Sequence, residues 1–410
     1  MSTNEFSQLT IDITKQLSKT VKKEQGIFIT PKTIIRKLHD SIIKFVNLNE
    51  SPCVDVLEPS CATCEIVSYL DGLYSNLFID AIEMNTTIYD KIRNHFSFKN
   101  TVKLIQGDFI KYDPNGKLYD LIIGNPPYLV IDKSVVPEAY SEYIVGRPNL
   151  FGLFLLHSMS MLKQNGILAF IIPKSFLNAA YYANIRHYLK SSGTILEIID
   201  FEKDGGFIDT QQSTFGFIFK KTGHIDIPSE CKYSIQFADN FMFADNANAL
   251  RELLSGSTTL AKLGLSVKTG TVVWNQHKPI LTSDSSKTLL LYNSNISKNN
   301  TIELLEFSND EKKQYIQMVG SNSPVIVVNR GNGNSAYKLN YAFVDGSTTY
   351  LAENHLNVIS SKLTGIERIE LFQKILASFK NPKTERFIKT FLGNNGLSKT
   401  ELETVFPIYL

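Results

Sequence analysis

Short apolar runs alternate with amphipathic stretches along the first 240 residues, and this alternation constrains the fold more than any other feature of the sequence. Buried strands of a parallel sheet are short and apolar, and the helices that connect them are amphipathic. We expect strands at 54–57, 77–82, 102–105, 121–123, 167–172, 195–200 and 214–220, and helices at 66–70, 87–95, 150–162 and 181–189. The alternation predicts an α/β domain built on a doubly wound sheet of about seven strands.

The pattern of apolar and polar residues changes near residue 241. From there, β-like segments at 267–274, 289–292, 325–329 and 341–344 are separated by clusters of Asn, Ser and Gly. A chain of 410 residues with 43% hydrophobic content is long enough to bury more than one core. We therefore expect a first domain at 1–240 and a second, mixed α+β domain at 241–410.

Charge is divided unevenly between these two parts. Residues 1–240 carry 24 Lys and Arg against 26 Asp and Glu, and residues 241–410 carry 18 against 14. The net charges are therefore −2 and +4. The positive excess of the second domain points to a polyanionic partner.

Four cysteines are too few and too irregularly spaced for a disulfide framework, which favours a reducing compartment. Cys61 and Cys64 have the spacing of half a zinc site, but no second pair of ligands accompanies them, so we expect no metal. No apolar run approaches the roughly 20 residues that span a bilayer. The sequence therefore predicts a cytoplasmic protein without a membrane role.

Asn125, Pro126, Pro127 and Tyr128 directly follow the apolar run at 119–124, where a strand is expected to end. The lone pair of an exocyclic amino group is delocalised into its ring, so methylation requires acceptors that polarise the NH2 without a strong base. The Asn125 carboxamide oxygen and a rigid prolyl carbonyl can accept its hydrogen bonds, because successive prolines fix φ and remove donors. Tyr128 offers a face on which a planar base can stack. The tetrapeptide predicts methylation of an amino group.

Acidic residues follow three successive expected strands, at the sheet edge where ligands bind. Glu58 begins the loop 58–64, Glu83 follows the second strand, and Asp108 and Phe109 follow the third. The loop contains no glycine, whereas a dinucleotide site would require G-x-G-x-x-G. Glu83 is placed to accept from ribose hydroxyls, Asp108 to accept from an adenine amino group, and Phe109 to cover the ring. This arrangement predicts a nucleoside cofactor without phosphates.

In this order the motifs resemble those of the γ-type amino-methyltransferases, and the TaqI-type DNA adenine methyltransferases are nearest in layout. The similarity extends over almost the whole chain. It includes QGIFITP at 25–31, VLEPSCATCE at 56–65, AIEMN at 81–85, QGDF at 106–109, RPNLFGLFL at 147–155 and FIDTQQSTF at 207–215. The resemblance implies a Rossmann-like, seven-stranded methyltransferase domain followed by a DNA target-recognition domain.

The resemblance also implies roles for individual residues. Thr30 would lie near the methionine part of S-adenosyl-L-methionine, and Phe207 would pack against the base stacked on Tyr128. Ala62 and Cys64 stand where the family often has glycine. The implied catalytic residues are Asn125, Pro126, Pro127, Tyr128 and Phe207. The implied cofactor-binding residues are Thr30, Glu58, Ser60, Ala62, Glu83, Asp108, Phe109, Asn125 and Phe154.

The implied reaction is transfer of a methyl group from S-adenosyl-L-methionine to adenine N6 in duplex DNA. Because the paired amino group is inaccessible inside a duplex, the base must be flipped out. In the second domain, side chains that can read base edges or hold phosphates are candidates for DNA contact. These are Lys268, Thr269, Trp274, Asn275, Lys278, Arg330, Asn332 and Asn334.

Other acceptors remain open: cytosine N4, an RNA base, or a protein glutamine amide. Asn125 favours adenine, since cytosine N4 enzymes more often carry Ser at this position, and the large second domain favours duplex DNA. A non-catalytic DNA-binding module would not need the tetrapeptide together with a cofactor pocket. We expect a monomer on double-stranded DNA, acting alone or as the modification enzyme of a type II restriction-modification system with a separate restriction endonuclease.

Overall fold

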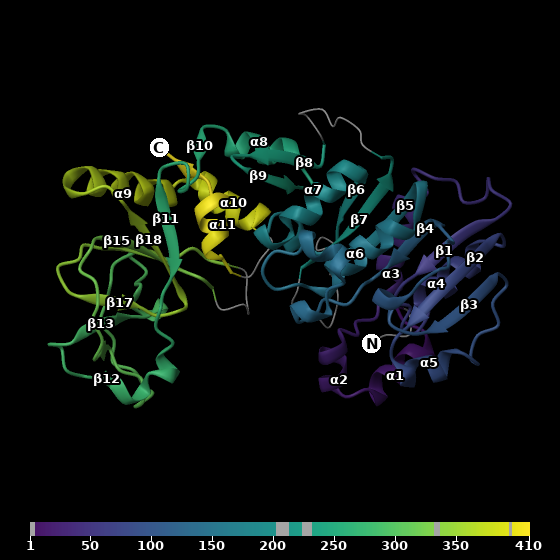
Figure 1. The fold of residues 1–410 in the computed structure, drawn as a ribbon, viewed down its shortest axis with the longest axis horizontal. Coiled ribbons are helices and arrows are strands. Elements are labelled where there is room, and N and C mark those ends of the chain that lie inside the picture. The colour runs from purple at the N-terminus through teal and green to yellow at the C-terminus, as the bar shows by residue number, and fades with distance from the viewer. Residues whose placement is uncertain (1–4, 202–212, 224–231, 332–336, 393–395) are drawn as a thin grey trace. The chain divides into compact units, whose positions relative to one another are not determined.

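The computed structural model describes residues 5–201, 213–223, 232–331, 337–392 and 396–410 (Figure 1). The chain forms two compact units: an N-terminal unit of Met1–Ile235 and Phe241–Ala247, and a C-terminal unit of Gln236–Asn240 and Asn248–Leu410. The chain passes between the units within the paired strands β8 (Ser234–Phe237) and β9 (Asn240–Phe243) and again after Ala247.

A seven-stranded sheet in the order β3-β2-β1-β4-β5-β7-β6 forms the centre of the N-terminal unit. All neighbouring pairs from β3 to β5 are parallel, and β7 runs antiparallel to both β5 and β6. The strands are β1 (Val54–Glu58), β2 (Leu77–Glu83), β3 (Thr101–Gln106), β4 (Tyr119–Gly124), β5 (Leu162–Pro173), β6 (Gly193–Asp200) and β7 (Thr214–Lys221). The order reverses between β1 and β4, so the carboxyl ends of these two strands flank a topological switch point.

Helices cover both faces of this sheet, as its alternating side chains require. Val56 packs into one apolar core with α3 and α4, while the next residue, Leu57, packs into a second core with α6 and α7. The helices are α1 (Gln8–Gln16), α2 (Lys19–Gln25), α3 (Lys32–Ile42), α4 (Glu65–Leu73), α5 (Thr86–Ile92), α6 (Leu150–Met161) and α7 (Ala183–Ser192). Short 3-10 helices are η1 (Phe109–Lys111), η2 (Lys133–Val135), η3 (Glu138–Tyr143), η4 (Lys174–Leu177) and η5 (Ala180–Tyr182). The doubly wound α/β fold predicted from the sequence is confirmed.

Two four-stranded sheets form most of the C-terminal unit, in the orders β11-β18-β15-β16 and β12-β14-β13-β17. Apolar residues from both sheets share one core. The strands are β10 (Ser257–Thr258), β11 (Leu265–Thr269), β12 (Leu281–Thr282), β13 (Thr288–Leu291), β14 (Tyr315–Ile316), β15 (Val325–Asn329), β16 (Tyr341–Val344), β17 (Tyr350–Ala352), β18 (Leu356–Ser361) and β19 (Ile408–Tyr409). The helices are α8 (Ala247–Leu254), α9 (Gly365–Phe379), α10 (Pro382–Phe391), α11 (Lys399–Thr404), η7 (Trp274–Gln276), η8 (Lys278–Ile280) and η9 (Asn293–Asn295).

The strand expected at 267–274 is wrong in its second half. β11 ends at Thr269, and Trp274 begins a 3-10 helix. At Gly270 the backbone approaches the segment before β18 so closely that a Cβ would lie 2.2 Å from the Glu353 carbonyl oxygen. This approach ends the strand, and only glycine permits it.

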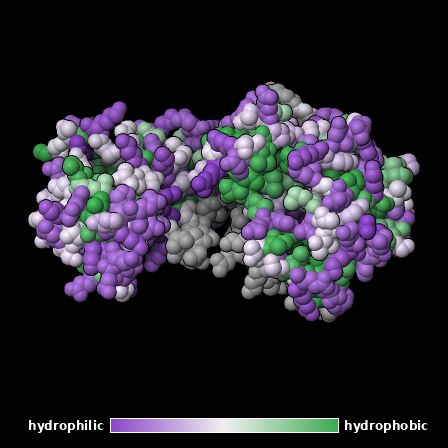
Figure 2. All heavy atoms as spheres, turned by 60° about the horizontal axis from the view of Figure 1, so that its bottom comes forward, coloured by the Kyte–Doolittle hydropathy of each residue, from purple (hydrophilic) through white to green (hydrophobic). Residues whose placement is uncertain are grey.

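No helix in the described part of the chain is long and apolar enough to cross a membrane. Hydrophilic side chains cover much of the visible face of each unit (Figure 2). Apolar side chains fill the cores described above, and some also gather on the visible face (Figure 2).

Arg186 is an unusual part of the N-terminal core, because its side chain is only 1% exposed. Its guanidinium donates to the carbonyl oxygens of Phe176 (3.0 Å), Ala179 (2.8 Å) and Phe241 (2.9 Å).

Removing the Arg186 donors would leave these buried acceptors unpaired, which costs about 1–3 kcal/mol of stability each. We therefore expect Arg186→Met to lower the free energy of unfolding by about 3 kcal/mol or more, measured by urea unfolding and circular dichroism. The exposed Arg36→Met is the control, and equal losses in both variants would contradict a structural role for Arg186.

Candidate active site

The side chain of Asn125 is held in one orientation at the end of β4. Its amide nitrogen donates to the Phe28 carbonyl oxygen (3.1 Å) and to Thr30 Oγ1 (3.2 Å). Its amide oxygen accepts from the Tyr128 hydroxyl (2.6 Å), which also lies 2.9 Å from the Ile171 carbonyl oxygen. An amide oxygen has two lone pairs, so Asn125 keeps acceptor capacity for a further amino group.

The backbone around the two prolines is also fixed. Ser60 Oγ donates to the Asn125 carbonyl oxygen (3.2 Å), which ties the loop after β1 to the loop after β4. On the other side Gly26, with φ +63°, lies so close that a Cβ would come within 2.9 Å of Pro127 Cβ. The tetrapeptide at 125–128 is therefore held between the segment 25–31 and the loop after β1.

The loop after β1 contains two residues in the left-handed region, Ala62 (φ 44°) and Cys64 (φ 61°). Glycine adopts this conformation without steric cost, whereas alanine and cysteine do not. The resembled family often has glycine at these two positions, and the left-handed backbone gives a conformational reason for that preference. This chain adopts the conformation with Ala62 and Cys64 instead. The Sγ atoms of Cys61 and Cys64 lie 3.9 Å apart in the same loop.

Glu83 joins this loop to the end of β2. Its carboxylate accepts from the backbone nitrogen of Ala62 (2.9 Å) and from that of Asn85 (2.6 Å). Burial raises the pKa of Glu83 to about 7, although these backbone hydrogen bonds oppose the shift. The carboxyl group therefore changes charge near neutral pH.

Glu58 lies deeper, with 2% of its surface exposed. Burial is the largest cause that raises its pKa to about 8, and the charges of Glu83 and Glu65 add to the effect. Among the residues that the structure describes, Glu58 Oε2 has no hydrogen-bond partner. A ligand with a hydroxyl or ammonium donor would satisfy this acceptor and stabilise the ionised form.

Two buried aromatic rings pack together near the end of β3: Phe109 from η1 and Phe154 from α6. The Phe109 and Phe154 centroids are 4.7 Å apart, with the rings tilted by 46°. Asp108 is half-buried and accepts from the Ile110 backbone nitrogen (3.0 Å). The Gly107 nitrogen donates to the Glu83 carbonyl oxygen (3.0 Å), so the ends of β2 and β3 are joined. The structure thus brings the predicted cofactor residues to one edge of the sheet.

The residues predicted to contact DNA are more scattered. Lys268 and Thr269 lie on β11, and Asn275 is exposed beside Trp274. The Lys278 ammonium lies 5.9 Å from the centre of a Trp274 ring.

Lys278 pairs with Glu311 (2.5 Å), and Arg330 Nη1 donates to the Asn354 carbonyl oxygen (3.0 Å). Both cations therefore already contact the protein itself. Three predicted residues lie outside the described part of the chain: Phe207, Asn332 and Asn334.

Asn85 and the Phe28 carbonyl were not among the site residues expected from the sequence. Asn85 caps the N-terminus of α5 and donates from Nδ2 to Gln25 Oε1 (2.6 Å). Both Asn85 and Phe28 lie within motifs already recognised, so their positions were available. Their contacts join segments about 60 and 100 residues apart, which no local pattern indicates.

Comparison with known proteins gives a consistent set of relatives. Residues 69–207 match the family described as the Eco57I restriction-modification methylase. The modification methylase CviBIII of Paramecium bursaria Chlorella virus NC1A is 31% identical over 305 residues, covering 73% of each chain. The type II methyltransferase M.CvrRI of Paramecium bursaria Chlorella virus XZ-6E is 26% identical over 412 residues, covering 98% of this chain and 99% of the relative.

Among solved structures, the cryoEM structure of a DrdV–DNA complex matches 92% of this chain and 54% of that chain. The TM-score is 0.50 and the sequence identity is 13%. At this identity the likeness concerns the fold alone.

The pKa of Glu58 leads to a prediction about stability. In the folded, ligand-free protein the pKa of Glu58 is about 8, so its carboxyl group stays protonated up to about that pH. The usual pKa of an exposed glutamate is 4.5. The folded state binds more protons between these values, so its free energy of unfolding should fall as pH rises through them. Glu58→Gln should make this decline shallower in urea unfolding of the ligand-free protein, leaving the part due to Glu83, whose pKa is raised to about 7.

The exposed Glu50→Gln is the matched control and should keep the decline of the original protein. If Glu58→Gln kept it as well, the buried carboxyl group would not be its source.

Proposed function

The chain belongs to the type II modification methyltransferases, and from this premise we propose that it methylates adenine N6 at a specific site in duplex DNA. In this proposal S-adenosyl-L-methionine is the methyl donor and the target base is flipped out of the helix. The orientation of Asn125 carries the proposal, since its amide nitrogen is already engaged by Phe28 and Thr30 and its oxygen remains an acceptor.

The residues present fit the proposed cofactor. Bound S-adenosyl-L-methionine supplies an electrophilic methyl group on a sulfonium centre. Glu83 would accept hydrogen bonds from the ribose hydroxyls, and Phe109 with Phe154 would cover the adenine ring. The buried, unpartnered Glu58 Oε2 supports this fit, because it is an acceptor without a donor in the described part of the chain.

Asn125 and Pro126 would act directly on the target amino group. The Asn125 oxygen and the Pro126 carbonyl would accept from its two N–H groups, drawing the lone pair out of conjugation and toward the methyl group. This is catalysis by positioning and electrostatics, without a nucleophilic side chain. Tyr128 contributes twice, because its hydroxyl orients Asn125 (2.6 Å) and its ring can stack on the base.

Base flipping costs a few kcal/mol. Stacking on an aromatic ring contributes about 1 to 3 kcal/mol per base, so Tyr128 and Phe207 together would offset much of this cost. The C-terminal unit would supply DNA contacts, starting with Lys268, Thr269 and Trp274. In this proposal the protein acts as a monomer, either alone or beside a separate restriction endonuclease that recognises the same site.

Removing Asn125 tests the reaction itself. We expect Asn125→Ala to lower turnover by about a hundredfold or more, while cofactor affinity changes little. The assay incubates unmethylated genomic DNA with protein and S-adenosyl-L-methionine, digests the DNA to nucleosides and identifies the product by mass spectrometry. Asn94→Ala, an exposed asparagine in the same unit, should remain active.

The methylated nucleoside that the assay detects identifies which base accepts the methyl group. N6-methyladenine that is lost in Asn125→Ala supports the proposal. N4-methylcytosine would retain the methyl-transfer chemistry but overturn the choice of base, and no DNA product would redirect the search to RNA or protein amides. Full activity of Asn125→Ala would refute the role of this side chain.

Two substitutions separate the roles of Tyr128. Tyr128→Phe keeps the ring but removes the hydroxyl that orients Asn125, so turnover should fall about tenfold while flipping persists. Tyr128→Ala removes both and should also reduce flipping. The measurement is fluorescence of 2-aminopurine at the target position, beside single-turnover rates. An unchanged fluorescence signal in Tyr128→Ala would contradict stacking by this residue.

A further inference from the structure

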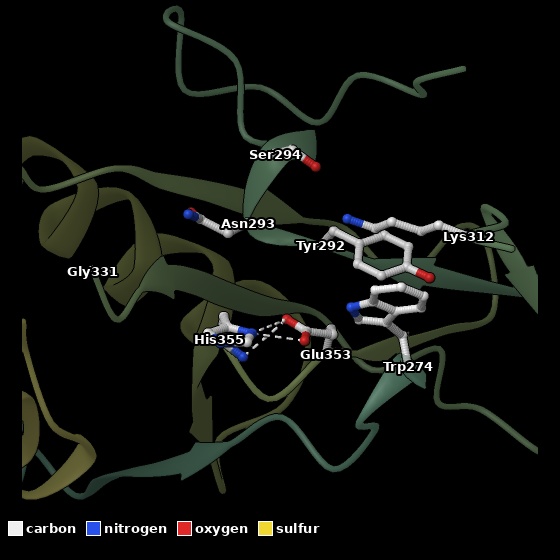
Figure 3. Close-up of a pocket in the computed structure, with 8 residues that line it drawn as sticks. All are labelled: Trp274, Tyr292, Asn293, Ser294, Lys312, Gly331, Glu353 and His355. Carbon is white, nitrogen blue, oxygen red and sulfur yellow. Dashed lines mark hydrogen bonds and ion pairs between the residues drawn. The ribbon is translucent and has the colours of Figure 1, made fainter. Parts of the chain in front are cut away.

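The C-terminal unit contains a cavity of about 290 Å³ that plays no part in the chemistry proposed above (Figure 3). It lies between the 3-10 helices η7 and η9 and the turn before β18. The residues that line it are Trp274, Tyr292, Asn293, Ser294, Lys312, Gly331, Glu353 and His355. Only Trp274 among them was expected from the sequence to contact DNA.

A cation is held over the aromatic wall of this cavity. The Lys312 ammonium lies 4.0 Å from the centre of the Tyr292 ring, 4.5 Å from that of Phe307 and 5.8 Å from that of Trp274. In the described part of the chain it has no hydrogen-bond acceptor or ion pair, although the neighbouring Glu311 pairs with Lys278. Its N–H donors are therefore available to a ligand.

A carboxylate lies on another side of the cavity. Glu353 is 3% exposed and accepts from His355 Nδ1 (2.7 Å) and from the His355 backbone nitrogen (3.0 Å). Two carboxylate oxygens offer about four acceptor sites, so these bonds leave capacity. Asn293 Oδ1 is buried and has no partner among the described residues.

The half-exposed indole of Trp274 completes the site. In Figure 3 its nitrogen faces the side occupied by Glu353, and the Lys312 side chain extends over the Tyr292 ring. The cavity thus combines a flat apolar surface with a cation, a carboxylate and an unpaired amide oxygen. A ligand that satisfies all of them must be planar and must carry both donors and acceptors on its edge.

We propose that this cavity binds one unstacked DNA base, distinct from the base that is methylated. Nucleobases are planar heterocycles with adjacent donors and acceptors, and aromatic side chains bind them by stacking. A phosphate group would satisfy Lys312 but would be repelled by Glu353, and it has no face for Trp274. The inference rests on the proposed function, which supplies DNA as the partner. An enzyme that flips its target leaves another base unpaired, so a ligand of this class is present at each turnover.

Trp274 is the single tryptophan of the chain, so its fluorescence reports on this cavity directly. The probes are a short duplex with one unpaired thymine, the base left when its partner adenine is flipped, and the same duplex with an abasic nucleotide at that position. The unpaired edge of thymine presents carbonyl acceptors for Lys312 and an N–H donor for Glu353. We expect saturable quenching by the first duplex and little by the second. Lys312→Met should raise the dissociation constant measured by quenching about tenfold, whereas the exposed Lys298→Met should not change it.

The outcomes separate this inference from the proposed function. Equal quenching by both duplexes would overturn the inference, since the cavity would then sense the backbone and not a base. So would unchanged Trp274 emission under conditions where mobility shift shows the thymine duplex bound. Methylation is assayed in parallel: methylation without base-dependent quenching refutes the cavity alone, and base-dependent quenching without methylation supports the cavity while refuting the proposed function. Circular dichroism of Lys312→Met confirms that it is folded.

Discussion

The parallel arrangement of β1, β2, β3 and β4 is the constraint on which the candidate site depends. Parallel strands place their carboxyl ends at one edge of a sheet, so Glu58, Glu83, Asp108 and Asn125 converge although nearly 70 residues separate the first from the last. The reversal of strand order between β1 and β4 opens a position for a ligand between them. Ser60 then joins the two loops by donating to the Asn125 carbonyl oxygen.

Holding the site in this form has an energetic cost. Burial raises the pKa of Glu58 and of Glu83, and the charge of Glu83 adds to the shift of Glu58. Ala62 and Cys64 also adopt left-handed backbone conformations. Local strain and unpaired acceptors of this kind concentrate at functional sites, where a ligand relieves them. The well-packed cores on both faces of the sheet provide the rigidity that this arrangement needs.

Most elements of the N-terminal unit were predictable, because their signals are local. Each of the strands β1 to β7 contains a short apolar run, and α6 is a continuous apolar stretch buried against the sheet. The C-terminal unit was less predictable. The strand expected to reach Trp274 ends at Thr269, because Gly270 approaches the Glu353 carbonyl in a part of the chain more than 80 residues away. The helices α9, α10 and α11 were not anticipated.

The sequence by itself determined the α/β class, the number of central strands and the order of the motifs, since periodicity and strand-end residues are properties of short segments. Only the tertiary structure decided how the motifs engage one another. It showed that the Asn125 amide is fixed by Phe28 and Thr30, and that burial raises the pKa values of Glu58 and Glu83. It also revealed the cavity around Lys312 and Glu353. Hydrogen-bond partners, burial and pKa shifts depend on which distant residues come into contact, and no local pattern contains that information.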